Sequence, residues 1–161
     1  MANKLRRSPP VCLWISSFMV IVGKLRLSEK FVGRKIKMQD GQEFTLFRHI
    51  TRYPVPQINN PRVFAVSFRF ARLSHNANKI ASIVPMLFIT GFPGFVTKIY
   101  GVNESNGYWL GMYQWRSKQD LEAYKKSFVF RMMNGRALNG TLNFLELENQ
   151  TLVDCVKDSL I

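Results

Sequence analysis

The chain has few of the residues that most often build catalytic and metal sites. Its 161 residues include only two cysteines and two histidines. Cys12 and Cys155 lie near opposite ends, which makes no disulfide framework, so we expect reduced thiols and a cytoplasmic protein. No His, Cys, Asp or Glu spacing is typical of a metal site, and we expect neither a metal nor another cofactor.

Acidic residues are also scarce. Ten Asp and Glu face 23 Lys and Arg, which gives a net charge of +13. Residues 1–62 hold twelve of the basic residues and three acids, so most of the excess is N-terminal. Anionic lipid, nucleic acid or solubility alone could explain this charge. A nucleic-acid partner is not expected, because no known binding motif is present.

Uninterrupted apolar runs are short. Residues 11–23 carry no charge, but thirteen residues are too few to span a bilayer, which takes about 20. Basic residues flank this run: Lys4, Arg6, Arg7, Lys24, Arg26 and Lys30. A packed helix, an interfacial anchor with Trp14 and Phe18 in lipid, and a signal sequence all fit the pattern. No small-x-small cleavage site follows it. Peripheral membrane contact therefore stays open beside a cytoplasmic location.

Turn-forming residues divide the chain into three parts. Asp40-Gly41 lies between alternating runs and predicts a hairpin over 34–48. His49 follows it, where a lone histidine is usually a surface residue. Prolines and asparagines predict a linker over 53–62. We expect a basic extension (1–62, with the apolar segment 11–23), a main domain (63–148) and a C-terminal tail (149–161).

The main domain has a β-α-β-β-α-β pattern. Ser74 and Ser117 are typical N-caps for its two helices, and Pro85 should kink or end the first. The expected elements are strands 63–71, 95–103, 108–115 and 141–148, with helices 75–90 and 118–134. This pattern predicts an α+β fold with a four-stranded antiparallel sheet.

The middle hairpin suggests a candidate site. With Asn106-Gly107 as a two-residue turn, facing residues have numbers that sum to 213. The predicted facing pairs are Lys98 with Trp115, Tyr100 with Tyr113, Val102 with Gly111, and Glu104 with Trp109. Phe95, Thr97, Ile99, Leu110, Met112 and Gln114 then share the opposite face. The face that carries Lys98, Tyr100, Tyr113 and Trp115 would combine a cation–π pair with a floor of aromatic rings. Such a surface suits a flat, partly polar molecule. Ordinary cross-strand packing explains the same rings without a ligand.

Strand 63–71 is apolar on both faces. Two helices cover only one face of a four-stranded sheet, so the other face needs a further layer. Self-association would supply that layer, and the N-terminal segment is the alternative.

The order of elements and three stretches carry a family resemblance. ARLSHNANKIASIVPMLFITGFPGF, GYWLGMYQW and SFVFRMMNGRA resemble the ferredoxin-like dimeric α/β-barrel superfamily, in a branch near monooxygenases of the antibiotic-biosynthesis type. The FVGRKI and FTLFRH segments resemble the same branch. The resemblance covers about residues 31–148. It implies a homodimer whose sheets face each other, with a pocket between sheet and helices in each subunit. Some relatives oxidise aromatic polyketides without metal or flavin, and others degrade haem. Helix 118–134 has no histidine to bind the iron, and strand 63–71 has Ser67 at the position where one would look for an asparagine, so the resemblance to haem-degrading relatives is incomplete and haem is disfavoured.

Two functions follow from these residues and the resemblance. In a cofactor-independent monooxygenase, His75 would be the base, with Asn78 on the same helix face. Tyr100, Tyr113 and Trp115 would bind the aromatic substrate, and Lys98 or Arg69 would stabilise an enolate-like anion. A non-catalytic homodimer that binds a small molecule or serves as a structural protein, held at a membrane by its basic N-terminus, is the alternative.

Overall fold

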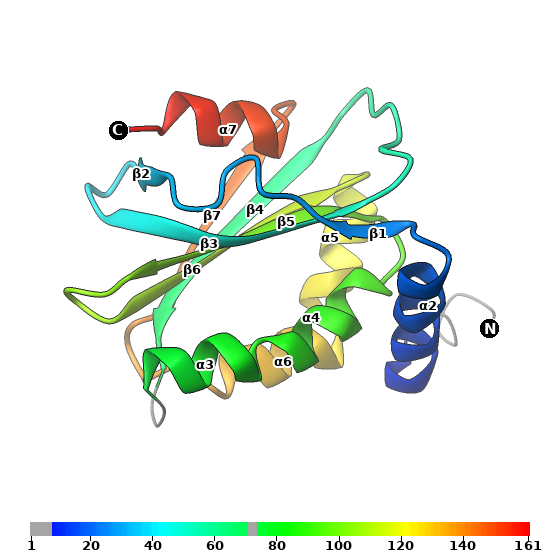
Figure 1. Ribbon diagram of the computed structural model, residues 1–161, viewed down its shortest axis with the longest axis horizontal. Helices are drawn as coiled ribbons and strands as arrows, with labels where there is room; N and C mark the ends of the chain where they lie inside the picture. The colour runs from blue at the N-terminus through cyan, green and yellow to red at the C-terminus, as the bar shows by residue number, and fades with distance from the viewer. Residues whose placement is uncertain (1–7, 71–73) are drawn as a thin grey trace.

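One seven-stranded antiparallel sheet forms the centre of the molecule (Figure 1). The computed structural model describes residues 8–70 and 74–161 and, for His75, only the backbone. The order is β1-β3-β5-β6-β4-β7, and β2 pairs with the outer part of β3. The strands are β1 Leu25–Leu27, β2 Lys35–Lys37, β3 Glu43–Arg52, β4 Arg62–Arg69, β5 Phe95–Asn103, β6 Tyr108–Trp115 and β7 Asn143–Glu148.

The helices lie on both faces of this sheet (Figure 1). Four of them, α3 to α6, cover one face, α7 lies on the other, and α2 packs beside α4 at the edge. Their bounds are α2 Pro9–Ile21, α3 His75–Ala81, α4 Ile83–Thr90, α5 Lys118–Lys125, α6 Phe128–Asn134 and α7 Leu152–Asp158. The order β5-β6-β4-β7 gives the expected ferredoxin-like arrangement, but the sheet has seven strands instead of four.

The predicted helix starts are confirmed, but both helices are divided in two. Ser74 accepts a hydrogen bond from the backbone N–H of Ala77, and Ser117 accepts one from Asp120. The first helix is interrupted at Ser82, three residues before Pro85, whose missing N–H and ring disfavour a continuous helix. The second restarts at Ser127, whose side chain caps α6. The predicted end of strand 63–71, at Ala71, lies outside the described residues.

The β5–β6 hairpin exists, but its predicted register is wrong by two residues. The side chain of Asn103 accepts hydrogen bonds from the backbone N–H groups of Ser105 and Asn106. A four-residue loop therefore replaces the two-residue turn, and Asn103 faces Tyr108. Because the shift is even, each residue keeps its face but changes its partner. Lys98 faces Tyr113, Tyr100 faces Gly111, and Val102 faces Trp109.

A β-bulge changes the sheet face of one further residue, Phe95, from the predicted one. The register shifts between Phe95 and Thr97, so Phe95 faces Trp115 instead of sharing the opposite face with Thr97. An extra residue in one strand moves the side chains before it to the other face. Phe95 consequently packs edge-on against Trp115 in the core below the helices.

The N-terminal extension takes part in the main sheet. β3 pairs with β5 from Thr45 opposite Val102 to Thr51 opposite Thr97. The hairpin predicted over 34–48 is present as β2 and the first half of β3. Residues before the Pro-rich linker and after it therefore share one sheet and one core.

The sheet face opposite α3 to α6 is covered by the chain itself. Phe31 and Ile36 from the N-terminal segment pack there, together with Leu152 and Val156 of α7. The N-terminal alternative is thus present, and the C-terminal segment contributes equally. No helix of the described residues is long and apolar enough to cross a membrane.

His49 differs from its expected surface position. It lies in the buried part of β3, on the face covered by α7 and Phe31. Its Nε2 is 2.9 Å from the Thr97 hydroxyl and 3.0 Å from that of Thr51. Burial, and then the charge of Lys30, lower the pKa of His49 from 6.5 to about 4.

Candidate functional site

A cavity of about 50 Å³ lies between the sheet and the helices. Its floor is the helix-facing side of β4, β5 and β6, and its opposite wall comes from α4, α6 and the residues that follow α6. The lining residues are Phe68, Phe70, Ser82, Pro85, Ile89, Lys98, Tyr100, Trp109, Leu110, Gly111, Tyr113, Met132, Met133 and Arg136. Most of this surface is apolar or aromatic, and none of these residues is acidic.

Lys98 is the central polar group of the cavity. Its side chain is only 4% exposed, and its Nζ lies 3.8 Å from the centre of the Tyr100 ring and 4.2 Å from that of Tyr113. No acidic residue of the described chain forms an ion pair with it. Burial lowers the pKa of Lys98 well below its ordinary value, and the positive charge of Arg48 lowers it further. The amine is therefore biased towards its neutral form, which can accept a proton.

The two tyrosines beside Lys98 stay protonated. Burial raises the pKa of both phenols above the ordinary value, and the neighbouring Tyr113 phenol raises the pKa of Tyr100 further. The Tyr113 hydroxyl donates a hydrogen bond to the sulfur of Met133 at 3.5 Å. The Tyr100 hydroxyl has no hydrogen-bond partner among the described residues. A buried hydroxyl without a partner beside a cavity can donate to a ligand.

Gly111 makes room for this arrangement. A Cβ atom at Gly111 would lie 3.0 Å from the Tyr113 hydroxyl oxygen and 3.1 Å from its ring. The absence of a side chain therefore lets the Tyr113 ring lie across β6 below the cavity. The Phe64 ring packs against Tyr113 from β4, with ring centres 5.9 Å apart.

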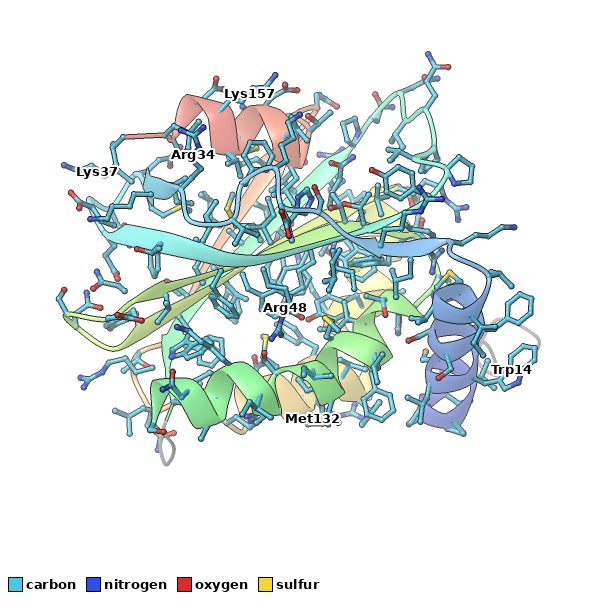
Figure 2. All side chains as sticks on the ribbon, in the orientation of Figure 1. Trp14, Arg34, Lys37, Arg48, Met132 and Lys157 are labelled. Atoms are coloured by element: carbon cyan, nitrogen blue, oxygen red, sulfur yellow. The ribbon has the colours of Figure 1, made fainter. Side chains whose placement is uncertain are left out.

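Two arginines at the site were not found from the sequence. Arg48 of β3 points between the sheet and the helices (Figure 2), and donates to the Ser82 hydroxyl at 2.7 Å and to the Lys79 carbonyl at 2.9 Å. The hairpin containing it was assigned to a separate extension, so nothing placed it beside Tyr100. Arg136 lies with its guanidinium 4.8 Å from the Phe70 ring centre. A basic residue after a helix is usually explained by the helix dipole, which gives no signal for a cavity.

Trp115 does not join the other predicted ligand-binding residues. It is fully buried and stacks on Tyr124, with ring centres 4.7 Å apart. Its indole N–H has no hydrogen-bond partner among the described residues. The predicted Lys98–Trp115 pair is thus wrong, because the register shift places Tyr113 opposite Lys98. Trp109, from the same strand, contributes the aromatic wall instead.

Two of the remaining predicted site residues, Asn78 and Arg69, do not line the cavity. Asn78 is buried in α3, and His75 begins that helix, but its side chain is outside the description. Arg69 ends β4 as an exposed residue whose backbone N–H donates to Thr141. The structure therefore brings together Lys98, Tyr100 and Tyr113, and leaves the roles predicted for His75, Asn78 and Arg69 as predictions.

The cavity is chemically suited to a small apolar molecule with an acidic proton. A neutral amine can remove that proton, and the resulting anion would share the cavity with the lysine ammonium, the Arg136 guanidinium and the Tyr100 phenol. In its present form the cavity is smaller than the 300–1,000 Å³ of pockets for drug-sized ligands. Met132, Met133 and Arg136 have flexible side chains, so their movement could enlarge it.

Comparisons with solved structures agree on the architecture. An anthrone oxidase-like protein aligns with a TM-score of 0.52 at 16% identity, over 68% of this chain and 54% of that protein. An uncharacterised ferredoxin-fold protein related to antibiotic biosynthesis monooxygenases, from Listeria monocytogenes, aligns with a TM-score of 0.54 at 11% identity, over 71% and 69%. This chain has the ferredoxin-like fold of monooxygenase-like proteins. It spans about half the length of the anthrone oxidase-like protein.

A haem-degrading enzyme from Listeria monocytogenes has the same ferredoxin-like fold. It aligns with a TM-score of 0.52 at 11% identity, over 86% of this chain and 93% of that enzyme. The cavity described here does not fit a haem, because about 50 Å³ is far too small and no histidine lines it among the described residues. Within the same residues, no group of three His, Cys, Asp or Glu could hold a metal ion. No protein-family model and no curated protein matches the sequence.

Proposed function

We propose that the chain binds a hydrophobic, aromatic small molecule in this cavity and acts on it as a cofactor-independent monooxygenase. The observation that carries the proposal is Lys98, a buried amine between two tyrosine rings with no acidic partner among the described residues. Unpaired buried ionisable groups cost stability and are concentrated at functional sites. The ferredoxin-like fold shared with an anthrone oxidase-like protein also supports the proposed oxygenase function.

The proposed reaction starts with proton transfer to Lys98. The neutral amine removes an acidic C–H proton from the substrate, and the carbanion forms beside the lysine ammonium in a cavity that Arg136 also lines. The carbanion transfers electrons to dioxygen and forms a C–O bond, which gives a peroxide anion. Lys98 returns its proton to that anion, and loss of water from the hydroperoxide leaves a carbonyl group. One oxygen atom enters the product and the other leaves in water.

Anthrone is a suitable first probe, since it is aromatic and has an acidic CH₂ group. The purified full chain should consume one dioxygen per anthrone and bind anthrone saturably. Lys98→Met keeps the length of the side chain but removes the base, and should lower oxygen uptake by at least about 100-fold. Lys126→Met, on the exposed surface, is the matched control and should keep the activity.

Substitution of His75 distinguishes the two candidate bases. If Lys98 is the base, His75→Ala should keep most of the activity, whereas loss of activity only in His75→Ala would assign the base to His75. Absence of both anthrone binding and oxygen uptake, repeated with other aromatic C–H and O–H acids, would contradict the proposal.

The second candidate is a binding protein without catalysis. The small volume of the cavity favours it, because oxygenation needs room for both substrate and dioxygen. Saturable binding that depends on Lys98 and Tyr100, with no oxygen uptake, would select this function. The expected homodimer is a proposal in either case, and Phe31, Ile36 and α7 cover the sheet face through which it was expected to form.

A further inference from the structure

The helix α2 is apolar on every side, but the protein covers only one of them. None of its thirteen residues is charged. Cys12, Ser16 and Met19 form a buried stripe with the i, i+4, i+7 spacing of one helix face. This stripe packs so closely on α4 that a Cβ atom at Gly91 would lie 1.8 Å from the Cys12 carbonyl oxygen.

The opposite stripe is exposed and aromatic. Trp14 is 69% exposed, Ile21 is 82% exposed, and Phe18 lies between them on the same face. The Trp14 and Phe18 rings stack with their centres 5.9 Å apart. Trp14 points away from the rest of the molecule (Figure 2). Helices that are apolar all round are normally covered on all sides, so this stripe needs a further apolar environment.

The charges around the stripe have one sign. No acidic residue precedes Glu29 in the sequence, and Lys24 and Arg26 are exposed directly after the helix. Arg26 is held in place, because its Nε donates to the Gly23 carbonyl at 2.8 Å and its guanidinium lies 5.0 Å from the Tyr53 ring centre. A second copy of this chain, also with a net charge of +13, would meet electrostatic repulsion. An anionic lipid surface offers the complementary charge and an apolar layer beneath it.

We propose that α2 docks the protein on an anionic bilayer and lies in its interface. Trp14, Phe18 and Ile21 enter the boundary between headgroups and acyl chains, and Lys24 and Arg26 contact anionic headgroups. The helix is about 20 Å long, which is shorter than the roughly 30 Å of the hydrocarbon core, so it lies on the membrane and does not cross it. This proposal is independent of the reaction proposed for the cavity.

Vesicle binding tests the proposal with the full chain. The protein should sediment with vesicles of equimolar phosphatidylglycerol and phosphatidylcholine, and much more weakly with phosphatidylcholine alone. Trp109 and Trp115 are already buried, so a blue shift of tryptophan emission on binding would come from Trp14. Trp14→Phe should lose the shift and keep most of the binding. No sedimentation with anionic vesicles, or binding without any shift, would overturn the proposal.

Matched variants distinguish vesicle binding through α2 from binding through the net positive charge of the whole protein. Trp14→Ser with Phe18→Ser should weaken vesicle binding at least about tenfold, and Lys24→Glu about fivefold or more. Their controls make the same kinds of change beside α7, on the far side of the molecule (Figure 1). They are Ile161→Ser, at an exposed apolar residue, and Lys37→Glu, at an exposed basic one.

Comparison with these controls also shows which results would contradict docking through α2. Equal losses from Lys37→Glu and Lys24→Glu would mean that overall charge binds the vesicles, and α2 would have no special role. If Trp14→Ser with Phe18→Ser instead converts a dimer to a monomer in sedimentation analysis, the stripe is a subunit contact and the proposal is wrong. Far-ultraviolet circular dichroism of each variant checks that it is folded.

Discussion

Lys98 occupies a position where an amine is costly. It is 4% exposed, faces two aromatic rings and has no acidic neighbour in the cavity lining. A buried charge without a partner would cost several kcal/mol, and burial accordingly lowers the pKa of the Lys98 amine well below its ordinary value. The same residue is the basis of the proposed function. Replacing Lys98 by an apolar residue should therefore raise the stability of the fold and lower the activity.

Replacing Lys98 by methionine tests this opposition. Lys98→Met should raise the free energy of unfolding by about 1–3 kcal/mol, because an apolar side chain of similar length removes the cost of burying an amine. The same variant should lose ligand binding. Urea denaturation at pH 7 measures the first effect, with Lys126→Met expected to stay within about 0.5 kcal/mol of the wild type. A destabilised Lys98→Met would show that the amine makes favourable interactions in the folded state.

His49 should make the fold sensitive to acid. Its pKa is about 4 in the folded protein against 6.5 for a free side chain, so the unfolded state binds more protons between these values. Stability is therefore lost as the pH falls through this window, by up to about 3 kcal/mol. His49→Gln keeps a polar side chain but cannot titrate. Unfolding free energies at pH 7.5 and 4.5 should differ less in His49→Gln than in the wild type, and an equal difference would contradict the assignment.

For single residues, sequence patterns predicted the sheet face of a side chain better than the residue opposite it on the next strand. The alternation in 95–103 and 108–115 placed Lys98, Tyr100 and Tyr113 on one side, because a shift of two residues conserves the face. The partner of Lys98 depended on the loop, where Asn103 binds backbone N–H groups that the Asn-Gly signal does not reveal. The surroundings of His49 come from three separate segments, so no local pattern could indicate its burial.

At the scale of elements, close packing fixes α2 to α4. Gly91 ends α4 with φ of −79°, a conformation open to any residue, so its role is the space it leaves. A Cβ atom there would overlap the Cys12 backbone. The helix α2 could be predicted from thirteen uncharged residues, but not the neighbour that it contacts. That neighbour depends on the helix break at Ser82 and on the direction of α4.

Gly91→Ala should loosen this contact. The overlap involves backbone atoms and cannot be relieved by a side-chain rotation, so α2 must move away. We expect a loss of about 2–3 kcal/mol in unfolding free energy and faster hydrogen exchange in α2. Gly135→Ala is the matched control, because Gly135 also ends a helix with φ of −66° and its nearest contact would be 3.5 Å. It should be neutral or stabilising by up to about 1 kcal/mol. Similar losses in both variants would exclude the packing explanation.

For the whole molecule, the second layer of the sheet comes from within the chain. The apolar residues in both alternating sets of strand 63–71 correctly indicated that both faces of β4 are covered. It could not indicate that residues from both ends supply the cover. Gln114 of β6 accepts a hydrogen bond from the backbone N–H of Leu152, which places the start of α7 on the sheet. Any dimer of the intact chain must therefore use a surface other than this face, or displace α7 from it.

Removing α7 should expose that face and change the oligomeric state. A chain ending at Thr151 would expose Val63, Leu110 and Met112, which α7 and its neighbours bury in the intact protein. Exposed apolar faces of this kind drive association, so the truncated chain should form dimers or larger species at concentrations where the intact chain does not. Sedimentation velocity measures this difference. Leu152→Ala, which leaves the helix present, should lower the unfolding free energy by about 2–5 kcal/mol without the same gain in mass, and Lys157→Ala should change neither. If the truncated chain keeps the oligomeric state and the stability of the intact protein, α7 is not needed to cover the sheet. A partner copy then becomes the better explanation for the apolar face of β4.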